Sequence, residues 1–205
     1  MMTRRSFAGM FGKAGVILSL GSLISVTTAC PAWLSNVYAD ILKYAPVALS
    51  AVASVLSILT GNGIVITPAI SAIIALIKVA ISDLQTAVTQ YQNAPTGQKS
   101  GLLGAISEAV TVAESNIQKF WADLTIPDAK LSSLIEGLLG IVVSTLQGFQ
   151  TQLPAPVTPV ATQAKMMRAG LSKTIAVTPK VRSVAHFRKE FNALLTQSGE
   201  GQHSI

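Results

Sequence analysis

The stretch Leu103–Leu124, which reads LGAISEAVTVAESNIQKFWADL, decides the fold. Its apolar residues recur at alternating spacings of three and four: Leu103, Ile106, Val110, Ala113, Ile117, Phe120 and Leu124. This spacing places the apolar side chains on one side of a helix, while most of the acids and amides fall elsewhere. The stretch therefore predicts an amphipathic helix with one face in a core.

Three further stretches repeat this helical periodicity on either side of it. The first covers about 32–60, the second begins with Thr67 as N-cap and Pro68 as first helical residue, and the third has Asp128 in its first turn. Breaker residues separate the stretches at 61–63, 93–97 and 125–127. The predicted core residues are Val37, Ile41, Tyr44, Ala48, Ala51, Val55 and Ile58, with Leu34 before them; Ile70, Ile74, Ile77, Ile81, Leu84, Val88 and Tyr91; and Leu131, Ile135, Leu138, Val142, Leu146, Phe149 and Leu153. Pro46 removes a backbone donor and is expected to kink or divide the first helix.

Four helices of similar length joined by short loops predict an all-α fold, an antiparallel up-down-up-down four-helix bundle over residues 30–153. Residues 154–162 form a Pro-rich linker, and residues 163–205 a basic tail that is helical or disordered. Within that tail Thr178 and Pro179 predict the start of an amphipathic helix at about 180–195. Residues 198–205 are expected to be disordered.

Several large apolar residues fall outside the predicted core faces: Leu42, Val47, Leu49, Leu56, Leu76, Val79, Leu102, Val112, Leu139 and Val143. They indicate either a wide core stripe with scattered surface hydrophobes, or a second face against a partner, another copy or lipid. No charged residue occurs from Tyr44 to Ile77. The apolar runs 46–60 and 64–77 are nevertheless shorter than the roughly 20 residues of a membrane span.

The N-terminal segment has the parts of an export signal. Thr3-Arg4-Arg5-Ser6-Phe7 precedes a moderately apolar middle, and no acidic residue occurs before Asp40. These residues resemble the twin-arginine export motif, with Arg4, Arg5 and Phe7 at its matching positions. This resemblance implies a signal over residues 1–29 and export from the cytoplasm, while the general secretory route stays open.

Val26-Thr27-Thr28-Ala29-Cys30 resembles a lipoprotein cleavage box. The resemblance implies that Cys30 becomes the mature N-terminus and receives lipid. Cys30 is the only cysteine, so an intramolecular disulfide is excluded. The alternatives are an unpaired thiol, with ordinary cleavage beside Ala29 or after Val37-Tyr38-Ala39.

The net charge of +6 is unevenly distributed. Residues 31–160 carry five lysines and seven carboxylates, whereas residues 161–205 carry seven Lys or Arg and two Glu. The high isoelectric point therefore belongs to the signal and the tail, and no nucleic-acid partner is predicted. The expected surface-docking residues are Lys165, Arg168, Lys173, Lys180, Arg182, Arg188 and Lys189. A basic amphipathic helix suits an anionic lipid surface or an acidic partner, and the alternative is that it docks on the bundle.

No arrangement of residues indicates an enzyme. Both histidines, His186 and His203, lie in the tail, and His186 has no evident spaced partner. No cluster has metal-ligand spacing, and the serines have no base beside them. We therefore expect no catalytic residues, no metal and no cofactor.

These observations predict an exported cell-envelope protein, in the periplasm or at the cell surface, anchored by lipid and by its basic tail. It would act as a structural or interaction module, with a second copy or an envelope protein as further candidate partners. The alternative is a membrane-active or pore-forming bundle that inserts the 46–77 hairpin.

Overall fold

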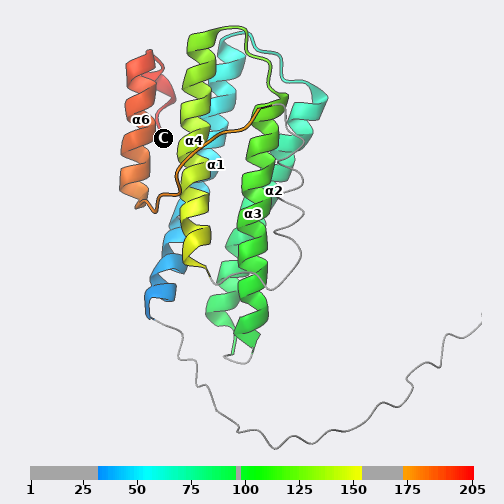
Figure 1. Ribbon diagram of the computed structural model, residues 1–205, viewed down its shortest axis with the longest axis vertical. Helices are drawn as coiled ribbons and strands as arrows, with labels where there is room; N and C mark the ends of the chain where they lie inside the picture. The colour runs from blue at the N-terminus through cyan, green and yellow to red at the C-terminus, as the bar shows by residue number, and fades with distance from the viewer. Residues whose placement is uncertain (1–31, 96–97, 154–172) are drawn as a thin grey trace, which may run out of the picture.

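The computed structural model describes residues 32–95, 98–153 and 173–205 and confirms an all-α bundle of four long helices with an additional C-terminal helix (Figure 1). The long helices are α1 (Ala32–Gly61), α2 (Pro68–Asn93), α3 (Lys99–Asp123) and α4 (Ala129–Gln152). The C-terminal helix α6 (Val184–Ser198) is followed by the short 3-10 helix η2 (Gly201–His203). Each long helix packs against its neighbours in the chain, and α1 also packs against α4, which closes the bundle.

The helix boundaries follow the capping chemistry. Thr67 accepts a hydrogen bond from the backbone N–H of Ile70 at 3.3 Å, and Asp128 accepts one from that of Leu131 at 2.7 Å. Gly63, just after α1, has φ +73°, a left-handed conformation that favours glycine. Pro46 lies inside α1 without dividing it.

The predicted core faces are confirmed wherever side chains are described. Leu103 and Leu131 are partly buried, and the other predicted core residues of the four helices are buried. Tyr38 of α1 packs on Tyr91 of α2, with ring centroids 4.4 Å apart. Tyr44 packs edge-on against Phe149 of α4 at 5.4 Å.

The apolar residues outside these faces divide between core and surface. Val47, Leu139 and Val143 are buried, while Leu76 and Val79 on α2 are 50% and 55% exposed. Val65, at the α1–α2 turn, is 78% exposed. A wide core stripe therefore explains the additional apolar residues of α4, whereas those of α2 form an apolar outer face.

Two expectations about the tail are corrected. The last helix begins at Val184 and not at 180, because Ser183 supplies the N-cap by accepting from the backbone N–H of His186 at 3.3 Å. Residues 199–205 are ordered: the two atoms of the Asn192 side-chain amide bond the backbone of Ile205, at 3.0 and 3.2 Å. The linker 154–162 lies outside the described residues.

Candidate functional site

The principal feature beyond the bundle is the way the C-terminal segment is fastened to it. Residues 173–183, called the strap here, cross the outer side of α4 from the end of α3 to the start of α6 (Figure 1). The helix α6 then runs antiparallel to α4 and packs on α4 and α1. The strap and α6 together hold most of the charged residues that the sequence assigned to docking.

Small residues on α4 allow the strap backbone to approach closely. The backbone N–H of Lys180 donates to the carbonyl of Ser144 at 2.9 Å. A Cβ atom at Gly148 would lie 2.6 Å from the backbone carbonyl of Lys180, closer than real contacts allow. A Cβ atom at Gly140 would lie 3.3 Å from a side-chain methyl group of Val177, a tight contact with a side chain and not with the backbone. Glycine is therefore required at 148 by the strap and not by the helix.

A side-chain amide on α3 holds the first part of the strap, at Ile175. The Gln118 amide nitrogen donates to the Ile175 carbonyl at 3.0 Å, and its oxygen accepts from the Ile175 N–H at 2.8 Å. Gln118 and Ile175 are both buried. The amide thus satisfies two backbone groups that burial would otherwise leave unpaired.

Lys173 fixes the beginning of the strap at the end of α3. Its Nζ donates to the carbonyl of Leu124, the C-cap residue, at 2.6 Å and lies 3.9 Å from the ring centroid of Trp121. A cation at a helix C-terminus interacts favourably with the exposed carbonyls. Burial lowers the pKa of the Lys173 ammonium below its ordinary value, and the negative charge of Glu136 opposes this shift.

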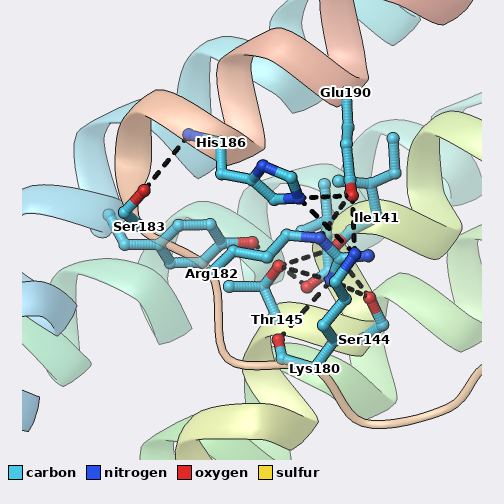
Figure 2. A network of polar contacts seen from close by, with 10 residues as sticks. Ile141, Ser144, Thr145, Lys180, Arg182, Ser183, His186 and Glu190 are labelled. Atoms are coloured by element: carbon cyan, nitrogen blue, oxygen red, sulfur yellow. Dashed lines mark hydrogen bonds and ion pairs between the residues drawn. The ribbon is translucent and has the colours of Figure 1, made fainter.

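Glu190 of α6 organises a polar cluster where the strap meets the helix (Figure 2). It accepts from Lys180 at 2.7 Å, from Arg182 at 2.5 Å and pairs with His186 at 2.7 Å. Arg182 also donates to the hydroxyl of Ser144 and, at 3.2 Å, to that of Thr145. The cluster, defined as these six residues, joins the strap, α6 and α4.

The electrostatics of the cluster favour the charged form of Glu190 and its pairing with Lys180 and Arg182. Partial burial raises the pKa of Glu190, but hydrogen bonds and charges from Lys180 and Arg182 outweigh this effect and hold the pKa at about 2. The Arg182 side chain is 9% exposed, so its guanidinium depends on these partners for compensation. Burial raises the pKa of the neighbouring Tyr44 hydroxyl, which donates to the carbonyl of Val142 at 3.1 Å.

The apolar side of α6 completes the attachment. Phe187, Phe191 and Leu195 are fully buried. The Phe187 ring meets the Tyr44 ring of α1 edge-on at 5.1 Å and stacks on Phe191 at 5.8 Å. Beyond α6, the hydroxyl of Ser54 on α1 donates to the carbonyl of His203 at 2.8 Å.

A second polar region lies between α3 and α4. Glu114 is buried on α3, and its Oε1 accepts from the side-chain amide of Gln147 at 2.6 Å. The side chain of Gln150 donates to the hydroxyl of Thr111 at 2.7 Å. These residues bind one another across the two helices.

A groove of about 610 Å³ lies beside the strap, with the N-terminal half of α4 as its floor. Glu136, Lys180 and Arg182 supply its charged groups, and Gly137 and Gly140 form part of its floor. Among the described residues, no group of three or more His, Cys, Asp and Glu is placed to hold a metal ion.

The structure separates the predicted docking residues into two groups. One group, Lys173, Lys180 and Arg182, forms hydrogen bonds to other residues of the protein. The other group, Arg188 and Lys189, is exposed on α6. Arg4, Arg5, Phe7, Cys30, Lys165 and Arg168 lie outside the described residues. The expectation that His186 has no spaced partner is wrong, because it pairs with Glu190 one helical turn away.

By length and composition, three of the helices are long and apolar enough to cross a membrane. They are α1 over Ser35–Gly61, the whole of α2 and the whole of α4. Their mean hydropathies over the best window are 1.7, 1.6 and 1.5. The helices α1 and α2 extend beyond the charge-free runs 46–60 and 64–77, and this added length brings each of them to that of a membrane span. No protein family, curated protein or solved structure matches the chain.

Proposed function

We propose that this chain is an exported protein of the cell envelope, in the periplasm or at the cell surface. It is anchored by lipid at Cys30 and acts there as a structural or interaction module. The N-terminal resemblances support export, and the position of α1 supports the anchor. The helix begins at Ala32, so cleavage before Cys30 leaves the bundle intact with its lipid directly at one end.

The burial of Tyr38 is the structural observation that supports processing before Ala39, where the proposed anchor lies. Its side chain is 1% exposed and packs on Tyr91, and Val37 beside it is also buried. Cleavage after Ala39 would remove both core residues and the first two turns of α1. Processing at Ala39 is therefore disfavoured relative to processing before Cys30.

Mass spectrometry of the mature N-terminus tests the proposal. The expected product begins at Cys30 and carries acyl mass, which a Cys30→Ala variant lacks. A non-acylated product that begins at Cys30, or one that begins at Asp40, removes the lipid anchor. An uncleaved chain in the cytosolic fraction removes export as well.

A single acyl chain binds membranes only marginally, so stable anchoring needs more than one chain or a second contact. Of the described cations proposed for docking, Arg188 and Lys189 are exposed on the outer side of α6, while Lys173, Lys180 and Arg182 hold the strap. We assign the surface contact to Arg188 and Lys189. Flotation with anionic vesicles is expected to weaken in an R188A/K189A variant and to persist in a control that replaces the exposed Lys43 of α1.

A membrane-active bundle is the second candidate function. It is supported by the exposed Leu76 and Val79 on the outer face of α2, by the exposed Val65 in the turn before it, and by the apolar lengths of α1 and α2. In this alternative the 46–77 hairpin inserts into the bilayer. Dye release from vesicles that disappears when Ser50 and Ser54 become Asp would favour insertion, and no release would favour the interaction module.

A further inference from the structure

The helix α6 separates an apolar surface from solvent. Its inner side consists of the fully buried Phe187, Phe191 and Leu195, and its outer side carries Arg188 and Lys189. The surface beneath belongs to α1 and α4, the two long helices against which α6 packs. The helix α6 thus places charged side chains over a part of the bundle that carries no charged residues.

The helices beneath α6 have the composition of membrane segments. α1 is free of charged residues from Tyr44 onward, and α4 from Gly137 to its end. Both reach the length and hydropathy of a membrane span. By contrast, α3 carries Lys99, Glu108, Glu114, Lys119 and Asp123 along its length and is not among the candidate spans.

Several hydroxyl groups on these two helices bond a carbonyl of their own helix. Ser50 donates to the carbonyl of Pro46 at 3.1 Å, Thr60 to that of Leu56 at 3.0 Å and Thr145 to that of Ile141 at 2.8 Å. Intrahelical bonds of this kind remove the cost of placing a hydroxyl in hydrocarbon. The Ser50 hydroxyl is therefore compatible with a lipid environment, whereas Ser54 bonds the carbonyl of His203 beyond α6.

The attachment of α6 combines the buried apolar contacts of Phe187, Phe191 and Leu195 with polar and backbone contacts at its two ends. The strap relies on close backbone approach at Gly148 and on the Glu190 cluster, while the C-terminal residues rely on Ser54 and Asn192. Each of these contacts involves backbone or ionic groups that a single substitution can disturb. The bundle beneath keeps its own core, in which Tyr38, Ile77 and Phe120 are buried far from α6 in sequence.

We propose that the α1–α4 face beneath α6 is a lipid-binding surface, and that α6 with its strap is the displaceable segment that occupies it in the free protein. The proposal rests on the membrane location given under the proposed function. Displacement of α6 exposes apolar side chains of two span-length helices, and burial of that surface in a bilayer replaces its burial under α6.

The test compares substitutions that release the strap with matched controls. Gly148→Ala places a methyl group against the Lys180 backbone, whereas Gly104→Ala is also a helical substitution but meets nothing within 4 Å. Glu190→Lys sets a cation against Lys180 and Arg182, and Gln197→Lys places the same residue at an exposed position of the same helix. Each full chain is mixed with neutral phosphatidylcholine vesicles, which exclude attraction by the basic residues, and amide exchange of α6 is recorded in parallel.

Release of α6 is expected to tighten vesicle binding by about tenfold, because apparent affinity scales with the fraction of binding-competent molecules. Gly148→Ala and Glu190→Lys should both lose amide protection at Phe187 and Phe191 and bind more tightly. The two controls should match the wild type. If Gly148→Ala does not fold, Glu190→Lys carries the same comparison.

Two results overturn the inference. One is a variant that loses protection in α6 while its vesicle binding stays at the wild-type level. The other is a released variant that dimerises without binding vesicles, since the face would then take a second copy. These outcomes can be told apart from failure of the proposed function. If Cys30 is acylated but the released variants show no gain in vesicle binding, only this inference is wrong. If the mature N-terminus is not acylated, only the lipid anchor is wrong.

Discussion

Gly148 provides the most direct test of how the strap is held. In the interior of a helix, replacing Gly by Ala normally stabilises by about 1 kcal/mol. At Gly148 the added Cβ would lie 2.6 Å from both the carbonyl carbon and the oxygen of Lys180 and 2.7 Å from the Val181 nitrogen. These are backbone atoms, so the strap must move as a unit.

The magnitude follows from opposing contributions. Overpacking costs about 1–3 kcal/mol, and loss of the hydrogen bond from Lys180 to Ser144 costs about 1 kcal/mol more. After subtraction of the helix gain, Gly148→Ala should be destabilised by about 1–3 kcal/mol. Gly104→Ala has open space around its new methyl group and should gain up to about 1 kcal/mol.

Urea unfolding of the two variants measures this difference, and amide exchange at Lys180 locates it. We expect Gly148→Ala to unfold at lower urea than the wild type, Gly104→Ala at equal or higher urea, and only the first to lose protection at Lys180. A Gly148→Ala protein as stable as Gly104→Ala, with Lys180 still protected, would refute the close-approach argument.

Three further predictions concern separate parts of the structure. Glu190 has a folded pKa of about 2 against an ordinary value of 4.5, so its contribution is full above pH 4.5 and is lost as the pH falls towards 2. The pKa shift of Glu190 alone corresponds to about 3 kcal/mol of stability. We expect a contribution of about 1–2 kcal/mol, because the side chains of Glu190 and Lys180 are 27% and 51% exposed. Glu190→Gln should therefore reduce the loss of stability between pH 4.5 and 2, whereas Glu108→Gln, at an exposed position, should leave that loss unchanged. Gln118→Leu leaves the N–H and C=O of Ile175 unpaired, and urea unfolding should show a loss of about 2–4 kcal/mol, whereas the exposed Gln92→Leu should change stability by less than about 0.5 kcal/mol. Thr67→Ala removes the N-cap of α2 and should cost about 1 kcal/mol by thermal unfolding, while a result equal to that of Thr86→Ala, an exposed mid-helix position, would contradict the capping role.

The bundle was predictable because each of its helices carries its own signals. The three-four spacing around Val110 and Ile117 identified a core face without knowledge of the partner helix. Thr67 and Pro68 marked a helix start from two adjacent residues. Signals of this kind are local, so a single sequence contains them in full.

The strap and the Glu190 cluster were not predictable because their partners are distant in sequence. Gln118 and Ile175 are separated by 57 positions, and Arg182 and Ser144 by 38. Glycine at 148 is explained only by the strap backbone that crosses α4 at this position. The spacing of His186 and Glu190, one helical turn apart, was the one local signal present, and it indicates an ion pair without indicating what the pair fastens.

The bond between Gln118 and Ile175 has a consequence for how this chain can vary. A side-chain amide that contacts only peptide groups does not distinguish the side chain at the contacted position. Substitutions at 175 that preserve an extended backbone and an apolar character therefore keep both hydrogen bonds. At 118, by contrast, Glu has no donor for the carbonyl, Lys has no acceptor for the N–H, and Asn is one methylene shorter. In divergent descendants of this sequence, the apolar residue at position 175 should therefore vary, while the glutamine at position 118 should be retained.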